Sequence, residues 1–475
     1  MQEGKHSPVS LPDEVVVVNV GLEAFGEAVR AQGAPAVDVE WRIPADGDAE
    51  LVDALVRLYG RAAARVEAAN REVLRRLKEG APELVGVGSA RDVVPGMEDR
   101  TILHPGPPLE WKDFCDPLRR SVRAAIAAEG WAPGGEAADR LVAHDEVVVL
   151  EAANHHSTVL PMATTIGPSA PVWIVECSRE GGRGYSALNQ GPGVMQWFGA
   201  DERGAVDRLV WLRDVAAPVL GAALEASGPI DILSLASQAV LMGDDVHLRS
   251  QAATNLFIRD LLPALVELSD ARAGEVARWL SGNHLFFLNL AMAAAKAITQ
   301  AAGAIEGSSI VTSMARNGTT FGIELAGIPD RWFTAGAPPV ESALFHAGFD
   351  ADDAALDIGD SAVLELVGLG GAAAGASPAV ATFLGGQMEA AAAATTAMAR
   401  ISAGRSDRFK VPYLGFRGSP LGIDVRKVVE LGITPSINTG ILHARSGQGQ
   451  IGAGVARAPM ECFRAALLAL DEALG

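Results

Sequence analysis

The apolar run from Leu285 to Ile305 constrains the fold most, because a segment of this length and composition has to be buried. It is nearly long enough to cross a bilayer, but a charge at its centre, Lys296, favours a buried helix of a soluble protein. Asn289 and Lys296 lie seven residues apart, which places both on one face of that helix. Burying such groups without a partner costs about 1–3 kcal/mol each, so this face needs polar partners or a polar cavity.

A second polar stretch precedes this run. Residues 242–247 have the sequence Met-Gly-Asp-Asp-Val-His, and Asn283-His284 opens the apolar run. The spacing predicts a helix in which four polar side chains share one face: His247, Gln251, Thr254 and Asn255. Two apolar helices that each carry a polar face most simply line the same cavity, so the sequence predicts a functional site there.

The bulk composition limits the class of protein. A chain of 475 residues is expected to form two to four domains, because single hydrophobic cores stop growing near about 250–300 residues. The net charge of −19 argues against a nucleic-acid or anionic membrane surface, which needs a concentrated basic face. The chain has 33 Arg but only 6 Lys, which makes a Lys inside an apolar segment conspicuous.

The cysteines indicate a reducing compartment. Cys115, Cys177 and Cys462 are far apart and form no CxxC pair, so we expect no disulfide and a cytoplasmic protein. Residues 1–12 are polar and contain no apolar core of a secretory signal.

The predicted fold class is α/β multidomain. Residues 14–20 and 36–41 are predicted strands around a helix at 22–32, which is a Rossmann-like βαβ beginning. The intervening turn lacks G-x-G-x-x-G, so we expect no nicotinamide cofactor. The predicted domains are a Rossmann-like α/β domain over 1–112, an α+β domain over 113–203, a helical region over 204–305 and a C-terminal α/β domain over 306–475.

Two polar segments have both a functional and a structural interpretation. His155 and His156 follow a predicted strand, and their imidazoles could polarise a carbonyl, act as general acids or bind a metal, or lie in a solvated loop. On an extended segment they point opposite ways, so at most one would reach a given ligand. Asp244 with His247 could be half of a metal site, although an Asp after Gly243 is also well placed to cap the next helix.

The cationic candidates also have both a functional and a structural interpretation. Lys296 is either a buried structural partner of an acid such as Glu306 or an active-site cation. Arg316 precedes Asn317-Gly318, a predicted hairpin turn of the primed type, and could present its guanidinium to a carboxylate or phosphate. Arg426 is a second candidate clamp or a helix-surface residue.

Three further segments complete the candidates. Residues 357–361, Asp-Ile-Gly-Asp-Ser, fit a turn with a helix cap or carboxylates that face a site. Asn438-Thr439-Gly440 and the glycine-rich loop predicted over 447–454 could offer backbone N–H groups to an anion.

These motifs resemble those of the AllG family, formerly described as YlbE-like proteins. The resemblance extends over most of the chain and rests on these segments: 17–21 (VVNVG), 94–97 (VPGM), 213–220 (RDVAAPVL), 242–244 (MGD), 314–318 (MARNG), 422–427 (GIDVRK), 437–440 (INTG) and 458–463 (APMECF). It identifies the chain as a member of a family that includes one subunit of the oxamate carbamoyltransferase of anaerobic allantoin breakdown.

The resemblance implies transfer of a carbamoyl group between carbamoyl phosphate and oxamate, with oxalurate as the carbamoylated product in purine nitrogen catabolism. It implies an oligomer with two partner subunits, AllF, which is FdrA-like, and AllH. We expect no cofactor. The familiar carbamoyltransferases carry Ser-Thr-Arg-Thr and His-Pro-x-Gln motifs, and this chain has neither beyond a partial His104-Pro105 match. Carbamoyl transfer here would therefore use a different scaffold.

Such a reaction needs cations for the phosphate, a donor for the carbonyl oxygen and a clamp for the carboxylate. Our catalytic candidates are His155, His156, His247 and Lys296, with no metal. The substrate-binding candidates are Asp244, Asn283, His284, Asn289, Arg316, Asn317, Arg426 and Asn438. The alternatives are a non-catalytic stabilising or regulatory subunit of an FdrA-like complex, and a metal-dependent amide hydrolase that uses His155, His156, Asp244 and His247.

Overall fold

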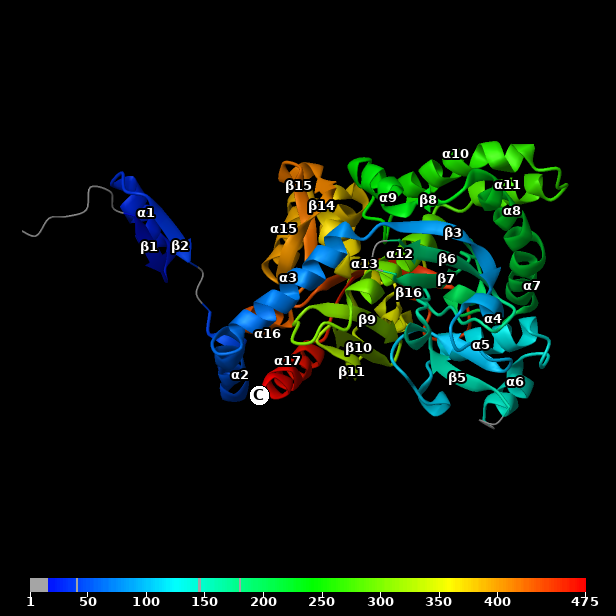
Figure 1. Cartoon of the computed structure of the whole chain (residues 1–475), viewed down its shortest axis with the longest axis horizontal. Helices are drawn as coiled ribbons and strands as arrows, with labels where there is room; N and C mark the ends of the chain where they lie inside the picture. Colours follow the sequence, from blue (N-terminus) through cyan, green and yellow to red (C-terminus); the bar gives the residue numbers. More distant parts are fainter. Residues whose placement is uncertain (1–15, 40–41, 144–146, 179–180) are drawn as a thin grey trace, which may run out of the picture.

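The computed structural model describes residues 16–39, 42–143, 147–178 and 181–475. It shows a mixed α/β chain in which several small sheets surround a helical core (Figure 1). The polar segment over residues 1–12 lies outside the described residues, as do residues 14–15 and 40–41 of the two strands predicted from the sequence.

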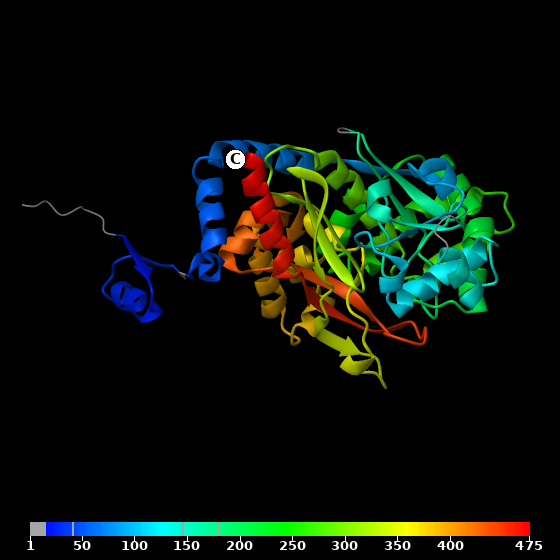
Figure 2. The same cartoon turned by 90° about the horizontal axis from the view of Figure 1, so that it is seen from below.

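The chain begins with the predicted βαβ unit. Strands β1 (Val17–Val20) and β2 (Ala36–Val39) pair in parallel around helix α1 (Glu23–Ala31). Figures 1 and 2 show this unit standing apart from the rest of the molecule. The next strand, β3 (Pro82–Ser89), belongs to a different, antiparallel sheet, so a Rossmann-like domain over 1–112 stays a prediction, as does the four-domain division.

The Arg-, Glu- and Ala-rich sequence over residues 51–79 predicts one long helix, and this prediction is wrong, because the chain forms two helices there. Helix α2 (Ala49–Tyr59) begins at Asp48, whose carboxylate accepts hydrogen bonds from two backbone N–H groups of the first turn. It ends at Gly60, which has a non-helical backbone, and α3 (Ala63–Glu79) follows. Glycine weakens helix continuity, which accounts for the break.

The central sheet has the order β7-β6-β3-β8 and is antiparallel throughout. Its other strands are β6 (Pro171–Cys177), β7 (Arg183–Ala187) and β8 (Ile230–Asp231). The predicted buried helix is α12 (Phe287–Ala302), which packs on β6 and β7 and is buried at every residue except Gln300. A side chain at Gly184 of β7 would come within 2.0 Å of the Ala293 carbonyl oxygen, so glycine and alanine permit this close approach.

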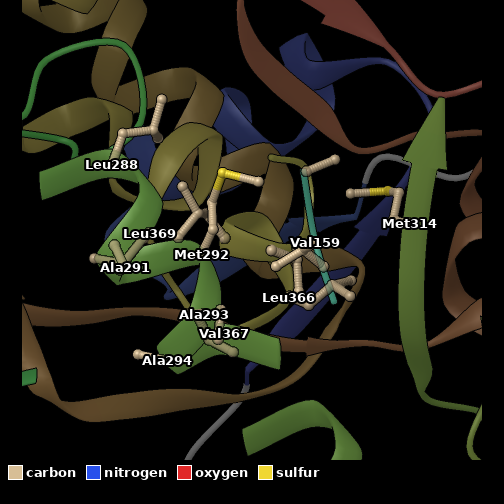
Figure 3. Packing of buried hydrophobic residues seen from close by; sticks show 14 of the residues in the cluster. Val159, Leu288, Ala291, Met292, Ala293, Ala294, Met314, Leu366, Val367 and Leu369 are labelled. Carbon is tan, nitrogen blue, oxygen red and sulfur yellow. The ribbon is translucent and has the colours of Figure 1, made fainter. Parts of the chain in front are cut away.

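The opposite face of α12 packs against the C-terminal half of the chain. Figure 3 shows Met292 and its alanine neighbours in α12 beside Leu366 and Leu369, which belong to or follow α13 (Val363–Leu366). Met314 of β9 lies in the same cluster (Figure 3). Helix α12 is therefore the shared core element of both halves.

The C-terminal half contains three small sheets. Strands β9 (Val311–Asn317), β10 (Thr320–Leu325) and β11 (Ile328–Gly336) form a meander with β13 (Ile358–Gly359) at the β9 edge. The antiparallel pairing of β9 and β10 confirms the hairpin predicted at Asn317-Gly318. The other strands are β12 (Val340–Phe345), β16 (Ser436–Leu442) and β17 (Gln450–Arg457) in one sheet, and β14 (Ser402–Val411) with β15 (Arg417–Ile423).

The glycine-rich loop predicted over residues 447–454 is only partly a loop. Strand β17 begins at Gln450, and its Gly454 passes so close to β12 that an added Cβ would lie 2.1 Å from the Ser342 carbonyl oxygen. The glycines in this strand therefore serve close backbone packing rather than a turn.

The remaining helices and strands cover the two halves. They are α4 (Ala90–Val93), β4 (Thr101–His104), α5 (Asp116–Ala128), α6 (Gly135–Val142), β5 (Val149–Ala152), α7 (Arg203–Trp211), α8 (Ala217–Ser227), α9 (Ile232–Leu241), α10 (Gln251–Glu267), α11 (Ala273–Ser281), α14 (Pro378–Phe383), α15 (Met388–Arg400), α16 (Val425–Leu431) and α17 (Met460–Leu474). Within the described ranges, no helix has the length and apolar character needed to span a membrane.

Candidate functional site

A cavity with a volume of about 670 Å³ lies at the start of α12. The turn before α10 and the strands β16 and β17 supply its other walls. Its polar lining brings together segments from across the chain: His247, Arg249, Gln251, Asn283, His284, His346, Ser361, Thr439, Gln448 and Gln450. We call it the main cavity.

The sequence predicted His247 on the same helix face as Gln251 and Asn255. This prediction is wrong, because His247 lies in the turn before α10. Gly243 ends the preceding helical stretch with a positive φ of 95°, and α10 begins only at Gln251. His247 and Gln251 still line the main cavity, whereas Asn255 is exposed and is not part of the cavity wall.

A buried carboxylate orients His247. Its Nδ1 lies 2.8 Å from Glu365 Oε1, and the Glu365 side chain has no exposed surface. The same oxygen accepts backbone hydrogen bonds from Gly371 and Asn438 at 3.0 and 3.2 Å. Because Oε1 accepts both backbone N–H groups, it is an acceptor for His247 as well, so Nδ1 of His247 carries the donated proton and Nε2 is left to exchange a proton with a molecule in the cavity.

Arg316 supports the wall from behind and does not line the cavity. Its guanidinium is fully buried and pairs with both carboxylate oxygens of Asp357 at 2.8 and 3.0 Å. It also donates to the hydroxyls of Ser361 and Thr439, which do line the cavity, at 3.3 and 3.2 Å. Arg316 therefore holds two hydroxyl groups of the wall in place, and its guanidinium N–H donors are already used by protein partners.

Asp244 and Asn438 have structural partners. Asp244 accepts a hydrogen bond from the Ala253 N–H in the first turn of α10 and pairs with Arg249. Burial raises the pKa of Asp244 to about 6, against the effect of these partners. Asp245 accepts a 2.6 Å hydrogen bond from the Asn438 side chain and two more from backbone N–H groups of its own turn.

The aspartates are thus accounted for by capping and by this turn. Among the residues that the structure describes, no three His, Cys, Asp or Glu side chains are grouped as a metal site would need.

Asn283 is held at the cavity by a buried chain of amides. Its Nδ2 donates to Asn189 Oδ1, and Asn189 in turn donates to Asn289 Oδ1, both at 2.9 Å. Asn289 donates to the Ala187 carbonyl at 2.7 Å, so it ties α12 to the end of β7 and stays out of the cavity. The neighbouring His284 is exposed and lines the main cavity.

Lys296 and His155 lie in a second cavity of about 200 Å³, near the other end of α12. Lys296 is eight residues beyond Leu288 of the main cavity, a rise of about 12 Å along a helix. The structure therefore does not bring Lys296 or His155 together with His247. The alternative metal-dependent hydrolase would need His155 and His156 together with Asp244 and His247. His155 lines the second cavity, whereas His247 lines the main cavity and Asp244 lies beside it.

The expected structural partner of Lys296 was wrong, because Glu306 pairs with Arg65. Lys296 instead donates to Asn154 Oδ1 at 3.2 Å. Burial lowers the pKa of Lys296, and the charges of Glu324 and Asp360 act in the opposite direction.

The other candidates lie outside both cavities. His156 is held by the Pro95 carbonyl on one ring nitrogen and by Glu151 at 2.5 Å on the other, in a 3₁₀ turn rather than an extended loop. Asn317 shapes its hairpin by accepting two backbone N–H groups.

Arg426 is buried between α3 and α16. It pairs with Asp424 and Glu67, each at 2.8 Å, and its guanidinium stacks 4.8 Å from the ring centre of Tyr59. These partners raise the pKa of Arg426 against the effect of burial. It is neither a substrate clamp at a cavity nor a helix-surface residue.

Glu365 was not among the residues predicted from the sequence, although a signal for it is present. It lies in a Val-Leu-Glu-Leu-Val stretch, so it is a charge in an apolar segment like Lys296. Arg249 was not predicted either. It lines the main cavity because residues 244–250 form a turn, whereas the sequence predicted a helix there.

Comparison with known proteins now decides the family. A family model described as "Oxamate carbamoyltransferase subunit AllG" matches residues 148–361, and these include Asn283, His284, Arg316 and Ser361. The "Oxamate carbamoyltransferase subunit AllG" of Escherichia coli (strain K12) is 41% identical over 86% of this chain and 99% of its own length. The chain belongs to the AllG family.

Two other relatives extend the match. The "Uncharacterized protein YahG" of Escherichia coli (strain K12) is 36% identical over 97% of this AllG family member and 98% of its own length. The crystal structure of a conserved protein of unknown function from Enterococcus faecalis V583 has a TM-score of 0.84 and 36% identity. The match covers 86% of this chain and 99% of that chain, so the two proteins share their fold.

Proposed function

We propose that this chain is a subunit of an oxamate carbamoyltransferase-like enzyme and that its main cavity holds the reactants. The proposal is supported by the 41% identity to a protein named as that subunit. The single structural observation that carries it is the His247–Glu365 pair, which directs an imidazole with a fixed proton position to the wall of a polar cavity.

The reaction joins the carbamoyl carbon of carbamoyl phosphate to the amide nitrogen of oxamate. One C–N bond forms, the bond from the carbamoyl carbon to the phosphate oxygen breaks, and the amide nitrogen loses one proton. Nε2 of His247 takes this proton and can return it to the departing phosphate. Such general acid–base catalysis contributes about 10²- to 10⁴-fold in rate.

The other charged and polar side chains of the main cavity are suited to bind and position the reactants. Arg249 is partly exposed and, although paired with Asp244, keeps further N–H donors for a phosphate or carboxylate oxygen. Asn283 and the hydroxyls of Ser361 and Thr439 are fixed by partners behind the wall, so they are suited to position a small polar reactant. His284 adds a second imidazole.

The complete enzyme in this proposal also contains an FdrA-like AllF subunit and an AllH-like subunit in the cytoplasm. The word subunit in the name of the relative supports an assembly.

Co-expression of the three chains followed by an assay for oxalurate tests the proposal. His247→Asn is expected to lower the rate at least a hundredfold, and His443→Asn, which lies outside the cavity wall, is the matched control. Equal rates in the His247→Asn and wild-type complexes would overturn the proposal that this cavity is catalytic.

A further inference from the structure

The second cavity contains polar groups that the proposed reaction does not use. Its wall comes from η3 (Ala153–His156), the last turns of α12 and strands β9, β10 and β11. Its side chains include a cation, two carboxylates, amides and hydroxyls: Lys296, Glu324, Asp330, Asn154, Gln300, Thr312 and Ser313. Asp330 lies at the exposed edge, whereas Glu324 is half-buried.

Two buried donors in this cavity lack full partners. Lys296 is 6% exposed, and its ammonium makes a single hydrogen bond to the described residues, with Asn154 Oδ1 at 3.2 Å. The Nδ2 of Asn154 is buried and has no hydrogen-bond partner in the described part of the chain, although Asn154 is only 9% exposed. Buried donors normally have partners, so these two indicate a bound acceptor such as a carboxylate.

The cavity also contains an acceptor that is separated from the lysine. Glu324 lies on β10 opposite Ser313 of β9. Its charge raises the pKa of Lys296, but among the described residues the two side chains form no ion pair within 4.0 Å. A ligand that carries only a negative charge would be repelled by the Glu324 carboxylate. A molecule with a carboxylate at one end and an N–H donor at the other would satisfy both groups.

We propose that the second cavity binds a small amino acid, with its carboxylate on Lys296 and Asn154 and its amino group on Glu324. The volume of about 200 Å³ has room for a small molecule of this kind. His155 lies at the exposed edge, where Trp332 donates to its Nε2 at 3.0 Å and thereby places the proton of the neutral ring on Nδ1.

Titration calorimetry of the purified chain tests this site, with glycine and β-alanine as bifunctional probes and acetate and acetamide as single-function probes. At least one bifunctional probe should bind saturably, and about tenfold more tightly than either single-function probe. Lys296→Met should weaken that binding about tenfold or more, and His247→Asn should leave it unchanged.

Glu324→Gln is the second variant, because a half-buried carboxylate can be replaced without emptying the core. It should also weaken the bifunctional probe while leaving acetate unaffected. Thermal melts establish that each variant is folded. Failure of every bifunctional probe to bind, equal binding of acetate, or loss of binding in His247→Asn but not in Lys296→Met would each overturn the proposal.

Discussion

His247 and Glu365 are 118 residues apart in the chain, yet His247 Nδ1 lies 2.8 Å from Glu365 Oε1 at the edge of the main cavity. Glu365 is completely buried, and the backbone N–H groups of Gly371 and Asn438 hold it in place. The pair thus fixes both the position and the tautomer of the imidazole, which is the arrangement expected of a general base held by a carboxylate.

Glu365→Gln should lower the rate of carbamoyl transfer by the complex about 10²- to 10⁴-fold while changing the KM for oxamate little. The amide cannot stabilise the protonated imidazole and can favour the wrong tautomer. Steady-state kinetics of the reconstituted complex measures both constants. A large rise in KM at unchanged kcat would instead assign the pair to substrate binding.

Gly370→Ala should damage the same pair by crowding it. An added Cβ would lie 2.2 Å from Glu365 Oε1 and 2.9 Å from His247 Nδ1. Gly386→Ala is the matched control, because that glycine also has a positive φ but has nothing within 4 Å of the added atom. Both variants carry a backbone cost of about 1–2 kcal/mol, and Gly370→Ala carries a further steric cost. Their rates of transfer are therefore compared in samples that thermal melts show to be folded, where Gly370→Ala should be the slower. Similar rates in the two variants would contradict the assigned role of the pair.

Arg316→Met should destabilise the fold by about 3–5 kcal/mol, because it leaves Asp357 buried without its charged partner. Arg259→Met, at an exposed pair with Asp260, should change stability by less than about 0.5 kcal/mol. Thermal melts of the two variants and of wild type give the comparison. Adding Asp357→Leu to Arg316→Met should recover part of the loss, since no unpaired charge remains.

Asp360 should make stability depend on pH. Burial raises its pKa from 3.8 to about 6, against hydrogen bonds from the N–H groups of Gly106 and Leu160. The folded protein therefore favours the neutral carboxyl group. That stabilisation is complete below pH 3.8 and is lost as the pH rises through about 6, a change of about 3 kcal/mol.

Melting temperatures of wild type and Asp360→Asn from pH 4 to 7 check this dependence. The variant stays neutral throughout, so wild type should lose stability relative to it as the pH rises. A constant difference between the two proteins across this range would show that Asp360 does not titrate there.

The elements that local pattern dictates could be predicted from the sequence. The alanine-rich helix is found at Phe287–Ala302, and the hairpin at Asn317-Gly318 is present, because helix periodicity and turn chemistry act over a few residues. The break at Gly60 was missed, since the pattern of apolar residues continues on both sides of it.

The candidate site depends on contacts that no local pattern encodes. His247, Asn283 and His284 were correctly expected to line one cavity, but Lys296 was assigned to it from its shared helix face with Asn289. A helix of sixteen residues is long enough to reach two separate cavities, so sharing a face does not mean sharing a site. Glu365 reaches His247 only through tertiary folding.

Oxalurate formation decides whether the main cavity is catalytic. The complex of this chain with its AllF-like and AllH-like partners should form oxalurate from carbamoyl phosphate and oxamate. The same complex with His247→Asn, assembled to the same extent and equally stable, should be at least about a hundredfold slower. Wild-type activity in that folded and assembled variant would contradict the proposal and would make this chain a non-catalytic subunit.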